Sequence, residues 1–273
     1  MKYSQYRAGR LAKPAYNAMV SLRKNKAAET TCEFLARASI PLREIGPENF
    51  PIGIASGCLI DYGGERWILT VAHATGNMGR WAIEMEYGEE RGAKLWSIGA
   101  MHFLDLLNLS DDTGQTLDLA YTAVPRDLQP RYQPRDEQAQ MMKSLPRIIF
   151  QQPDLGYAPG GKRLYGFAGG VMASKEHHFG KLWHGTKLVC YPKLSFAGED
   201  EQFYFFKLPF AHPGHEFFKG TSGAPICDRK RNIAALVSGP GNEPDTIRGI
   251  KMHYFRSALD TSLLKLRTEK PAL

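Results

Sequence analysis

The stretch KGTSGAPI, residues 219–226, places two glycines around a serine just before a strand-like run. Closely spaced glycines mark backbone that bends sharply or is approached closely by another group. One interpretation is an ordinary turn between two strands. The other is an exposed nucleophile, Ser222, on a tight loop whose N–H groups point at a bound molecule. The turn alone does not decide, because a nucleophilic serine also needs a base and a group that orients the base.

The composition describes a folded chain with a substantial core. It has 273 residues, 43% of them hydrophobic, enough for one large core or two small ones. No apolar run approaches the roughly 18 residues of a membrane span. The basic residues 1–26 lack the apolar stretch of a secretory signal. The four cysteines form no C-x-x-C pair, which favours reduced thiols and a cytoplasmic location.

The formal net charge of +7 raises the question of a nucleic-acid partner. However, the 35 basic residues are spread along the chain and mixed with 28 acidic ones. The densest basic run, residues 229–231, has the pattern of a solvated turn between two strand-like segments. The charge pattern therefore argues against nucleic acid, and we expect no membrane partner.

Short strand-like segments dominate the chain after residue 45, and helical spacing is confined to the two ends. Two segments flank the turn YGGE and predict a β-hairpin. The full set of strand-like segments is 53–61, 66–71, 81–87, 93–104, 116–124, 163–167, 187–191, 203–208, 233–237 and 249–255. Residues 257–267 predict a C-terminal amphipathic helix. This pattern predicts an all-β sandwich or barrel architecture.

A polar segment with four prolines, residues 125–146, suggests two β halves joined by a linker. We therefore expect a helical N-terminal extension at residues 1–45, a first β domain at 46–128 and a linker at 129–146. A second β domain with the C-terminal helix follows at 147–273.

A candidate base ends the segment RWILTVAHAT, residues 66–75. His73 follows a buried-type strand, and the alanines on both sides leave room for a substrate beside the imidazole. Such a histidine can act in general acid–base catalysis, or it can be purely structural.

A candidate partner for this histidine lies in TLDLAYTAV, residues 116–124, where Asp118 interrupts an apolar strand. A buried carboxylate is costly unless other groups satisfy it. It can accept a hydrogen bond from an imidazole N–H, or it can lie at a strand edge facing water. Asp111 and Asp112 are rivals, but they lie in a turn-like stretch.

The chain order is His73, Asp118, Ser222, and at this point the sequence resembles the trypsin-like (chymotrypsin-fold) serine proteases. The resemblance rests on three motifs, LTVAHA at 69–74, LDLA at 117–120 and GTSGAP at 220–225. It covers about residues 50–264. An α/β-hydrolase would need the order serine, acid, histidine and a glycine where Ala224 stands.

The resemblance implies two antiparallel six-stranded β-barrels, with the site between them. Ser222 would attack a peptide carbonyl, His73 would carry its proton, and Asp118 would hold the imidazole. The N–H groups of Gly220 and Ser222 would form the oxyanion hole. The resemblance implies a serine endopeptidase that needs no cofactor.

Three further residues are implied to bind the substrate. Ser238 and Gly239 resemble the strand that pairs with the residues before the scissile bond, although the following Pro240 lacks an N–H. Glu216, six residues before Ser222, stands where the family places the floor of the specificity pocket. A carboxylate there would favour arginine or lysine. The alternative is an exposed glutamate outside an apolar pocket.

The sequence also departs from the family. Ala55 and Ala74 stand where a disulfide would flank the histidine, and Thr221 replaces the aspartate that pairs with a freed N-terminus. We therefore expect a site that forms without N-terminal cleavage, with residues 1–45 as a docking arm for a regulatory protein, as in a partner-held intracellular effector.

Two other functions remain as alternatives, a binding module on a protease fold without turnover and a basic nucleic-acid-binding protein. A metal site is not expected, because no Cys/His spacing suits zinc; His177 and His178 are the one adjacent histidine pair.

Overall fold

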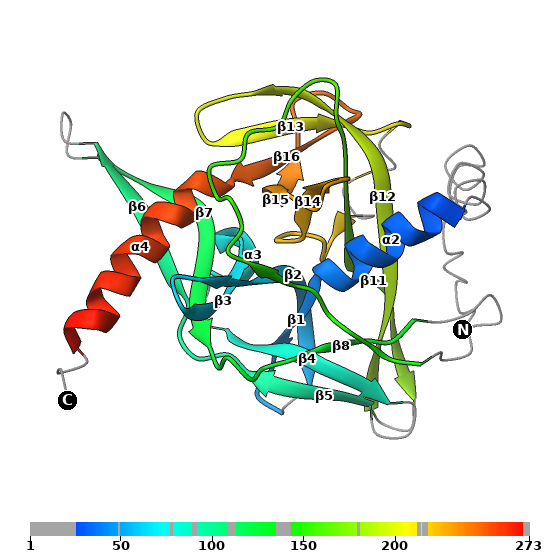
Figure 1. The fold of residues 1–273 in the computed structure, drawn as a ribbon. Coiled ribbons are helices and arrows are strands. Elements are labelled where there is room, and N and C mark those ends of the chain that lie inside the picture. The colour runs from blue at the N-terminus through cyan, green and yellow to red at the C-terminus, as the bar shows by residue number, and fades with distance from the viewer. Residues whose placement is uncertain are drawn as a thin grey trace.

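The computed structural model describes residues 26–48, 50–76, 79–88, 92–108, 113–134, 143–178, 181–211, 214 and 218–269. Within them the chain is mostly β, with helix α2 (Lys26–Ala38) near one end and helix α4 (Met252–Glu269) near the other (Figure 1). In this described part, no helix is long and apolar enough to span a membrane.

The first half of the chain and strand β10 together form an eight-stranded sheet. Its order is β5-β4-β1-β2-β3-β7-β6, and β10 pairs in addition with β2. The expected second domain, 147–273, is therefore wrong at its start, because residues 149–151 pair with β2 of the first half. Its strands are β1 (Ile40–Ile45), β2 (Pro51–Tyr62), β3 (Glu65–Thr70), β4 (Arg80–Gly88), β5 (Gly92–Ser97), β6 (His102–Asn108), β7 (Thr113–Val124) and β10 (Ile149–Gln151). The expected hairpin is present as β2–β3. Consecutive strands pair as antiparallel neighbours in β1–β2, β2–β3, β4–β5 and β6–β7. The connections from β3 to β4 and from β5 to β6 instead cross the sheet.

The second half forms a closed barrel with the order β11-β12-β13-β16-β15-β14. Its strands are β11 (Leu164–His178), β12 (Lys181–Glu199), β13 (Phe203–Lys207), β14 (Pro225–Asp228), β15 (Ile233–Pro240) and β16 (Thr246–Lys251). Between the halves, β8 (Arg131–Tyr132) and β9 (Leu145–Pro146) form a small separate sheet inside the expected linker.

Two closed barrels were expected, and the described strand pairs close one. The first-half sheet is not closed, because the terminal strands β5 and β6 do not pair with each other among the described residues. The β6–β7 hairpin projects from one side of the molecule, while β5 lies at another (Figure 1). Closure depends on such a long-range pairing, which no local sequence pattern specifies.

The helical extension was expected to reach residue 45, and this is wrong for residues 40–45. Residues 40–45 form β1, which pairs with both β2 and β4. Ile40 and Leu42 are fully buried, so their alternation with polar neighbours places them in the core of the sheet. Helix α2 lies within the expected helical extension, and residues 1–25 lie outside the described residues.

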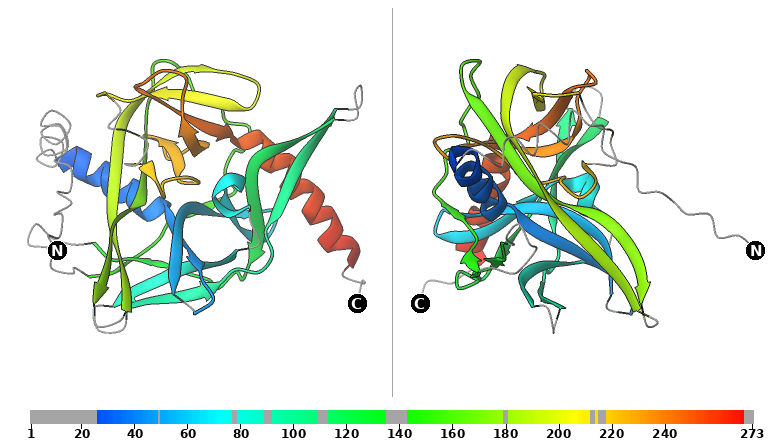
Figure 2. Two further views of the ribbon diagram at one scale, coloured as in Figure 1. Left: turned by 180° about the vertical axis from the view of Figure 1, so that it is seen from behind. Right: turned by 90° about the vertical axis from the view of Figure 1, so that its right-hand side faces the viewer.

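The long β11–β12 hairpin links the barrel to the sheet, and it runs alongside both halves in two views (Figure 2). Arg43 on β1 donates a hydrogen bond from Nη2 to Oγ1 of Thr186 on β12 at 2.9 Å. The expected strands 163–167 and 187–191 are short parts of these much longer strands, because backbone pairing continues across the hairpin as far as His178 and Lys181.

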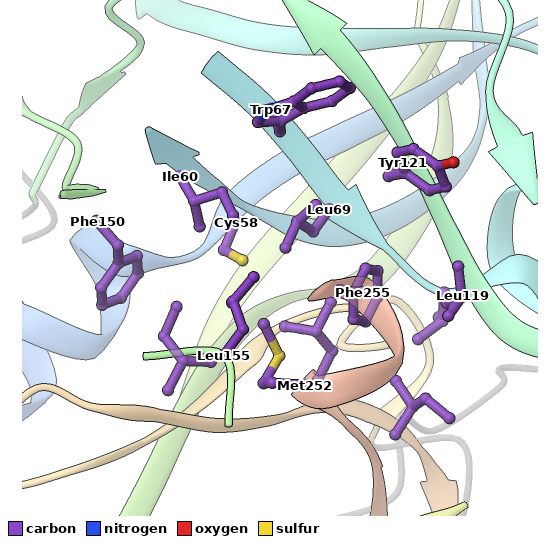
Figure 3. Close-up of a cluster of buried hydrophobic side chains, with 14 of the residues drawn as sticks. Cys58, Ile60, Trp67, Leu69, Leu119, Tyr121, Phe150, Leu155, Met252 and Phe255 are labelled. Carbon is purple, nitrogen blue, oxygen red and sulfur yellow. The ribbon is translucent and has the colours of Figure 1, made fainter. Parts of the chain in front are cut away.

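One cluster of buried apolar side chains contains residues from both halves and joins them (Figure 3). Cys58 and Leu69 of the sheet pack in it with Met252 and Phe255 of α4. The helix begins at Met252, inside the segment expected as a strand, because residues 252, 255, 259 and 263 bury one helical face. The halves are thus held together by the burial of apolar surface.

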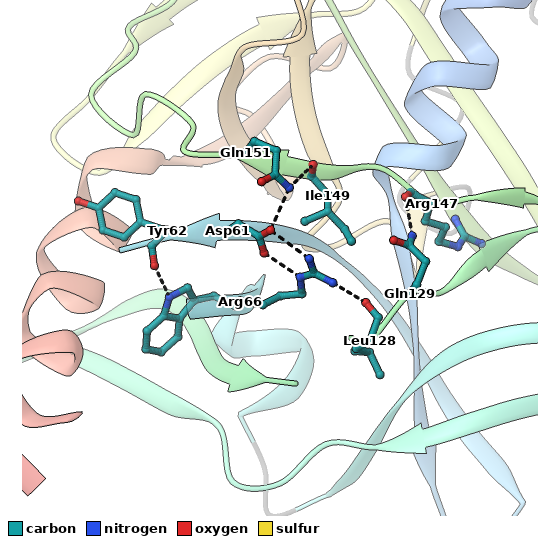
Figure 4. A network of polar contacts seen from close by, with 9 residues as sticks. Asp61, Tyr62, Arg66, Leu128, Gln129, Arg147, Ile149 and Gln151 are labelled. Carbon is teal, nitrogen blue, oxygen red and sulfur yellow. Dashed lines mark hydrogen bonds and ion pairs between the residues drawn. The ribbon is translucent and has the colours of Figure 1, made fainter. Parts of the chain in front are cut away.

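A buried polar network supports the β2–β3 hairpin (Figure 4). Arg66 donates from Nε to Oδ1 of Asp61 at 2.7 Å and from Nη1 to the carbonyl of Leu128 at 2.8 Å. Gln151 on β10 donates from Nε2 to the other oxygen of Asp61 at 2.9 Å. The network therefore ties the segment at Leu128 and strand β10 to the β2–β3 hairpin.

Candidate active site

The candidate base His73 lies in a single helical turn, α3 (Ala72–Thr75), directly after β3. Thr75 closes this turn by donating from Oγ1 to the carbonyl of Val71 at 3.1 Å. The side chain of His73 is 48% exposed, whereas that of Asp118 is 17% exposed. The imidazole is therefore open to a ligand on one side and covered by a carboxylate on the other.

Asp118 on β7 holds the imidazole by both of its oxygens. His73 Nδ1 lies 2.9 Å from Oδ1 and 2.9 Å from Oδ2, and the backbone N–H of His73 donates to Oδ1 at 3.0 Å. Because Nδ1 faces a carboxylate, we assign the imidazole proton to Nδ1. Nε2 is then left as an acceptor.

Ser222 presents its hydroxyl to that acceptor. The distance from Ser222 Oγ to His73 Nε2 is 3.0 Å, within hydrogen-bonding range. The structure thus brings together three residues that are far apart in the chain, two from the first half and one from the second.

Ser238 adds a contact that sequence reasoning did not assign to it. Its Oγ donates a hydrogen bond to Oδ2 of Asp118. Ser238 was expected to contact a substrate through its position on β15, whereas its hydroxyl faces the carboxylate. The available signal was a serine directly after the buried run 233–237, since a buried hydroxyl needs a partner.

The turn around Ser222 depends on its two glycines. Gly220 has a φ of +101° and Gly223 a φ of +87°, a region that side chains disfavour. A Cβ on Gly223 would lie 2.0 Å from the carbonyl oxygen of Ser56. The backbone N–H of Thr221 donates to the carbonyl of Phe218 at 2.8 Å, which closes a tight turn.

Among the described residues, two N–H groups of this turn have no hydrogen-bond acceptor, those of Gly220 and Ser222, whereas the amides of Thr221 and Gly223 are both bonded to carbonyls. An unpaired amide beside a nucleophile is a donor for developing negative charge.

Ser56 on β2 ties this turn to the first half of the chain. Its N–H donates to the carbonyl of Ser222 at 2.8 Å, and its Oγ donates to the carbonyl of Gly220 at 2.9 Å. Thr70 in turn donates to the carbonyl of Ser56 at 2.7 Å. Sequence reasoning missed Ser56, although a fully buried serine in an apolar strand is a signal for such a role.

A hollow with mainly apolar walls opens beside Ser222. Gly239, which was expected to contact substrate, is among the residues that line it. The lining residues are Phe218, Thr221, Ser222, Val237, Gly239, Pro240 and Ile247. Glu216, the expected floor of the specificity pocket, lies outside the described residues.

Thr221 stands at the position where the trypsin-like proteases, which the sequence resembles, were expected to have an aspartate that pairs with a freed N-terminus. It is fully buried, and its Oγ1 donates to the carbonyl of Phe218 at 2.8 Å. The hydroxyl is therefore satisfied inside the turn and needs no ammonium group.

Comparison with known proteins identifies the fold. No family model and no curated protein matches the chain. Among solved structures, an inactivated protease paralogue of the scabies mite is similar at 10% identity and a TM-score of 0.53, with 86% of this chain and 95% of that chain covered. The serine endoprotease of Yersinia pestis aligns at 11% identity and a TM-score of 0.48, with coverage of 87% and 66%.

A protease of M. tuberculosis, in an inactive form, aligns at 13% identity and a TM-score of 0.46, with coverage of 93% and 96%. The structure with a TM-score above 0.5, the inactivated protease paralogue, supports the fold that the sequence motifs indicated, so the resemblance to the trypsin-like (chymotrypsin-fold) serine proteases is confirmed for the fold. At such identities the likeness describes the fold alone.

Proposed function

We propose that the protein is a serine endopeptidase that hydrolyses peptide bonds through an acyl-enzyme. One observation carries the proposal: His73 Nε2 lies 3.0 Å from Ser222 Oγ while Nδ1 of the same ring faces both oxygens of Asp118. A nucleophile, a base and a group that orients the base are the elements that acyl transfer requires.

In the proposed reaction, Ser222 Oγ attacks the substrate carbonyl while its proton moves to His73 Nε2. The N–H groups of Gly220 and Ser222 donate to the negatively charged oxygen that forms. His73 then gives the proton to the leaving amine, and the acyl group stays on Ser222. Water repeats these steps and releases the acid. Asp118 stabilises the charged imidazolium throughout.

The substrate is proposed to pair with β15 at Ser238 and Gly239 and to place one side chain in the hollow beside Ser222. The described walls of that hollow, including Phe218, Val237 and Ile247, suit an apolar side chain. A carboxylate of Glu216 at the floor would instead select arginine or lysine.

We further propose that the protein is a cytoplasmic effector. A protein partner would regulate its activity through residues 1–45. Support comes from α2, which packs on the barrel with Leu35 fully buried and leads into β1. A partner that moves α2 would shift the population of conformations in the barrel that carries Ser222.

The experiment is labelling of the 273-residue chain with a fluorophosphonate, followed by mapping of the labelled residue. We expect label on Ser222, none on the Ser222→Ala variant, and unchanged label on a control variant of an exposed serine, Ser257→Ala. A binding module without turnover or a nucleic-acid-binding protein would leave Ser222 unlabelled, which would refute the proposal.

A further inference from the structure

Arg248 lies beside an uncovered stretch of the strand next to Ser222. In the barrel it is paired directly with Gly239 of β15, in antiparallel register. Directly opposite residues place their side chains on the same face of a sheet. Gly239 has no side chain, and a Cβ built there would lie 3.9 Å from Arg248 Nε and meet nothing else within 4 Å. The space over Gly239 is therefore open, with Arg248 along its side.

The guanidinium of Arg248 has no acceptor among the described residues. Its Nε is fully buried and makes no hydrogen bond, and no carboxylate lies within ion-pair distance in the described part of the chain. The buried arginines of the first half differ: Arg43 is paired with Glu84 and Arg66 with Asp61. A buried donor without an acceptor loses its hydrogen bond to water on folding and gains none in return, so a bound acceptor would stabilise this site.

An aromatic ring fixes where the guanidinium lies. Arg248 stacks on the ring of Phe203, with its Cζ 4.6 Å from the ring centroid. Phe203 comes from β13, which pairs with β16 on the side away from β15. The cation thus lies between the Phe203 ring of β13 and the open space over Gly239 of β15, and its planar fork is pre-organised for a carboxylate.

The uncovered end of β15, at Gly239, is the stretch along which a peptide would lie. Gly239 follows Ser238, whose hydroxyl binds Asp118, and both Gly239 and Pro240 line the hollow beside Ser222. A peptide with one side chain in that hollow would carry its preceding residues along Gly239 as an added strand. Because Pro240 has no N–H to donate, backbone pairing is weakened there, and side-chain contacts contribute more to recognition.

We propose that Arg248 is a specificity-determining residue that binds an acidic side chain of the peptide, two to four residues before the scissile bond. This inference rests on the proposed peptidase function and names a substrate class for it. Charge-assisted hydrogen bonds between a guanidinium and a carboxylate are stronger than neutral ones and add geometric selectivity. The sequence signal is weak, since Arg248 appears as one charge between Ile247 and Gly249.

The test uses peptidyl phosphonate probes that react with Ser222. All have leucine at the residue before the reactive phosphorus, and they carry glutamate or glutamine at each of the three preceding positions in turn. The rate of Ser222 labelling is measured for the wild-type chain, Arg248→Gln and a control variant of an exposed arginine, Arg229→Gln. A small fluorophosphonate is run in parallel as a probe of Ser222 alone.

At one of the three positions, we expect the wild-type chain to react about tenfold or more faster with the glutamate probe than with the glutamine probe. The preference should weaken at high salt. Arg248→Gln should abolish it while keeping the rate with the glutamine probe, and Arg229→Gln should preserve it. Arg248→Lys keeps the charge without the planar fork and should retain part of the preference.

The outcomes separate this inference from the proposed function. If the small fluorophosphonate does not label Ser222, the peptidase proposal fails. If it labels Ser222 but glutamate and glutamine probes react equally at all three positions, the inference about Arg248 is overturned. Labelling by the fluorophosphonate without labelling by any peptidyl probe overturns it as well. If Arg248→Gln does not fold, the inference is decided by the wild-type chain alone. Its labelling rates with the glutamate and glutamine probes are then compared at low and high salt.

Discussion

Ser56 donates a hydrogen bond from its Oγ to the carbonyl oxygen of Gly220 at 2.9 Å, although the two residues belong to different halves of the chain. The backbone N–H of Ser56 also donates a hydrogen bond to the carbonyl oxygen of Ser222. The turn that presents the two open N–H groups is therefore positioned by a strand of the opposite half.

Ser56→Ala should lower kcat by roughly tenfold and leave KM within about twofold, because the freed Gly220 carbonyl lets the open N–H groups leave their orientation. The buried carbonyl also loses a partner, at a cost of about 1–3 kcal/mol in unfolding free energy. Steady-state kinetics and urea unfolding measure the two effects. A loss of stability with unchanged kcat would show that Ser56 is structural and does not position the turn.

The three candidate catalytic residues should differ in their effects. Ser222→Ala or His73→Ala should lower kcat by up to about a millionfold, because each removes a group that moves electrons or protons. Asp118→Asn should lower it by about ten-thousandfold, because an amide orients the imidazole in the wrong tautomer. The kcat values come from peptide-cleavage rates, with the concentration of active enzyme determined by active-site titration. Substantial cleavage by Ser222→Ala would place the activity elsewhere.

The site should form while the N-terminal segment is still attached. Thr221 is buried and satisfied by the carbonyl of Phe218, so the turn needs no ion pair with a freed N-terminus. Intact-mass measurement of the fluorophosphonate-labelled chain should show residues 1–45 present. Thr221→Asp should reduce labelling, because it buries a carboxylate without a partner, while Thr221→Ser should keep it. Label found solely on shortened molecules would contradict this expectation.

Cleavage should favour an apolar residue just before the scissile bond. Phe218, Val237 and Ile247 line the hollow beside Ser222, and a charged side chain would lose hydration there. Profiling with a peptide library, for the wild-type chain and for Glu216→Gln, tests this. A preference for arginine or lysine that disappears in Glu216→Gln would instead establish Glu216 as the floor of the pocket.

The Asp61–Arg66 pair should make stability depend on pH. The hydrogen bond from Arg66 lowers the pKa of Asp61 below its ordinary value of 3.8. The native chain thus binds this proton less tightly than the unfolded chain does, so the stabilisation is complete above pH 3.8 and is lost as the pH falls through the lowered pKa.

Asp61→Asn should therefore cost about 3 kcal/mol at neutral pH, because it leaves Arg66 buried without its partner charge. The difference from the wild type should shrink in acid. Urea unfolding at a series of pH values checks this, with the exposed Asp127→Asn as the control. A difference that stays constant into acid would show that the carboxylate charge does not matter.

Much of the candidate site could be predicted from the sequence because its signals are local. The glycines around Ser222, the small residues around His73 and the carboxylate inside an apolar strand each follow from a need of the backbone or of a buried charge. The chain order of histidine, aspartate and serine also disfavoured an α/β-hydrolase fold. The contacts of Ser56, Ser238 and Arg248 could not be predicted, since each joins strands whose register is set by the whole barrel.

The sequence by itself determined the mainly β character of the chain, the β2–β3 hairpin, the helical ends and the residues able to supply a nucleophile, a base and an acid. These properties depend on side-chain alternation and turn chemistry within a few residues. The tertiary structure alone decided that the first-half sheet stays open in its described strands and that α4 starts at Met252. It also decided that Ser56 reaches the turn of Ser222 and that Arg248 lies beside the open space over Gly239. These outcomes depend on pairing between distant segments, where shape, burial and hydrogen-bond satisfaction of the whole molecule select one arrangement among many that local patterns allow.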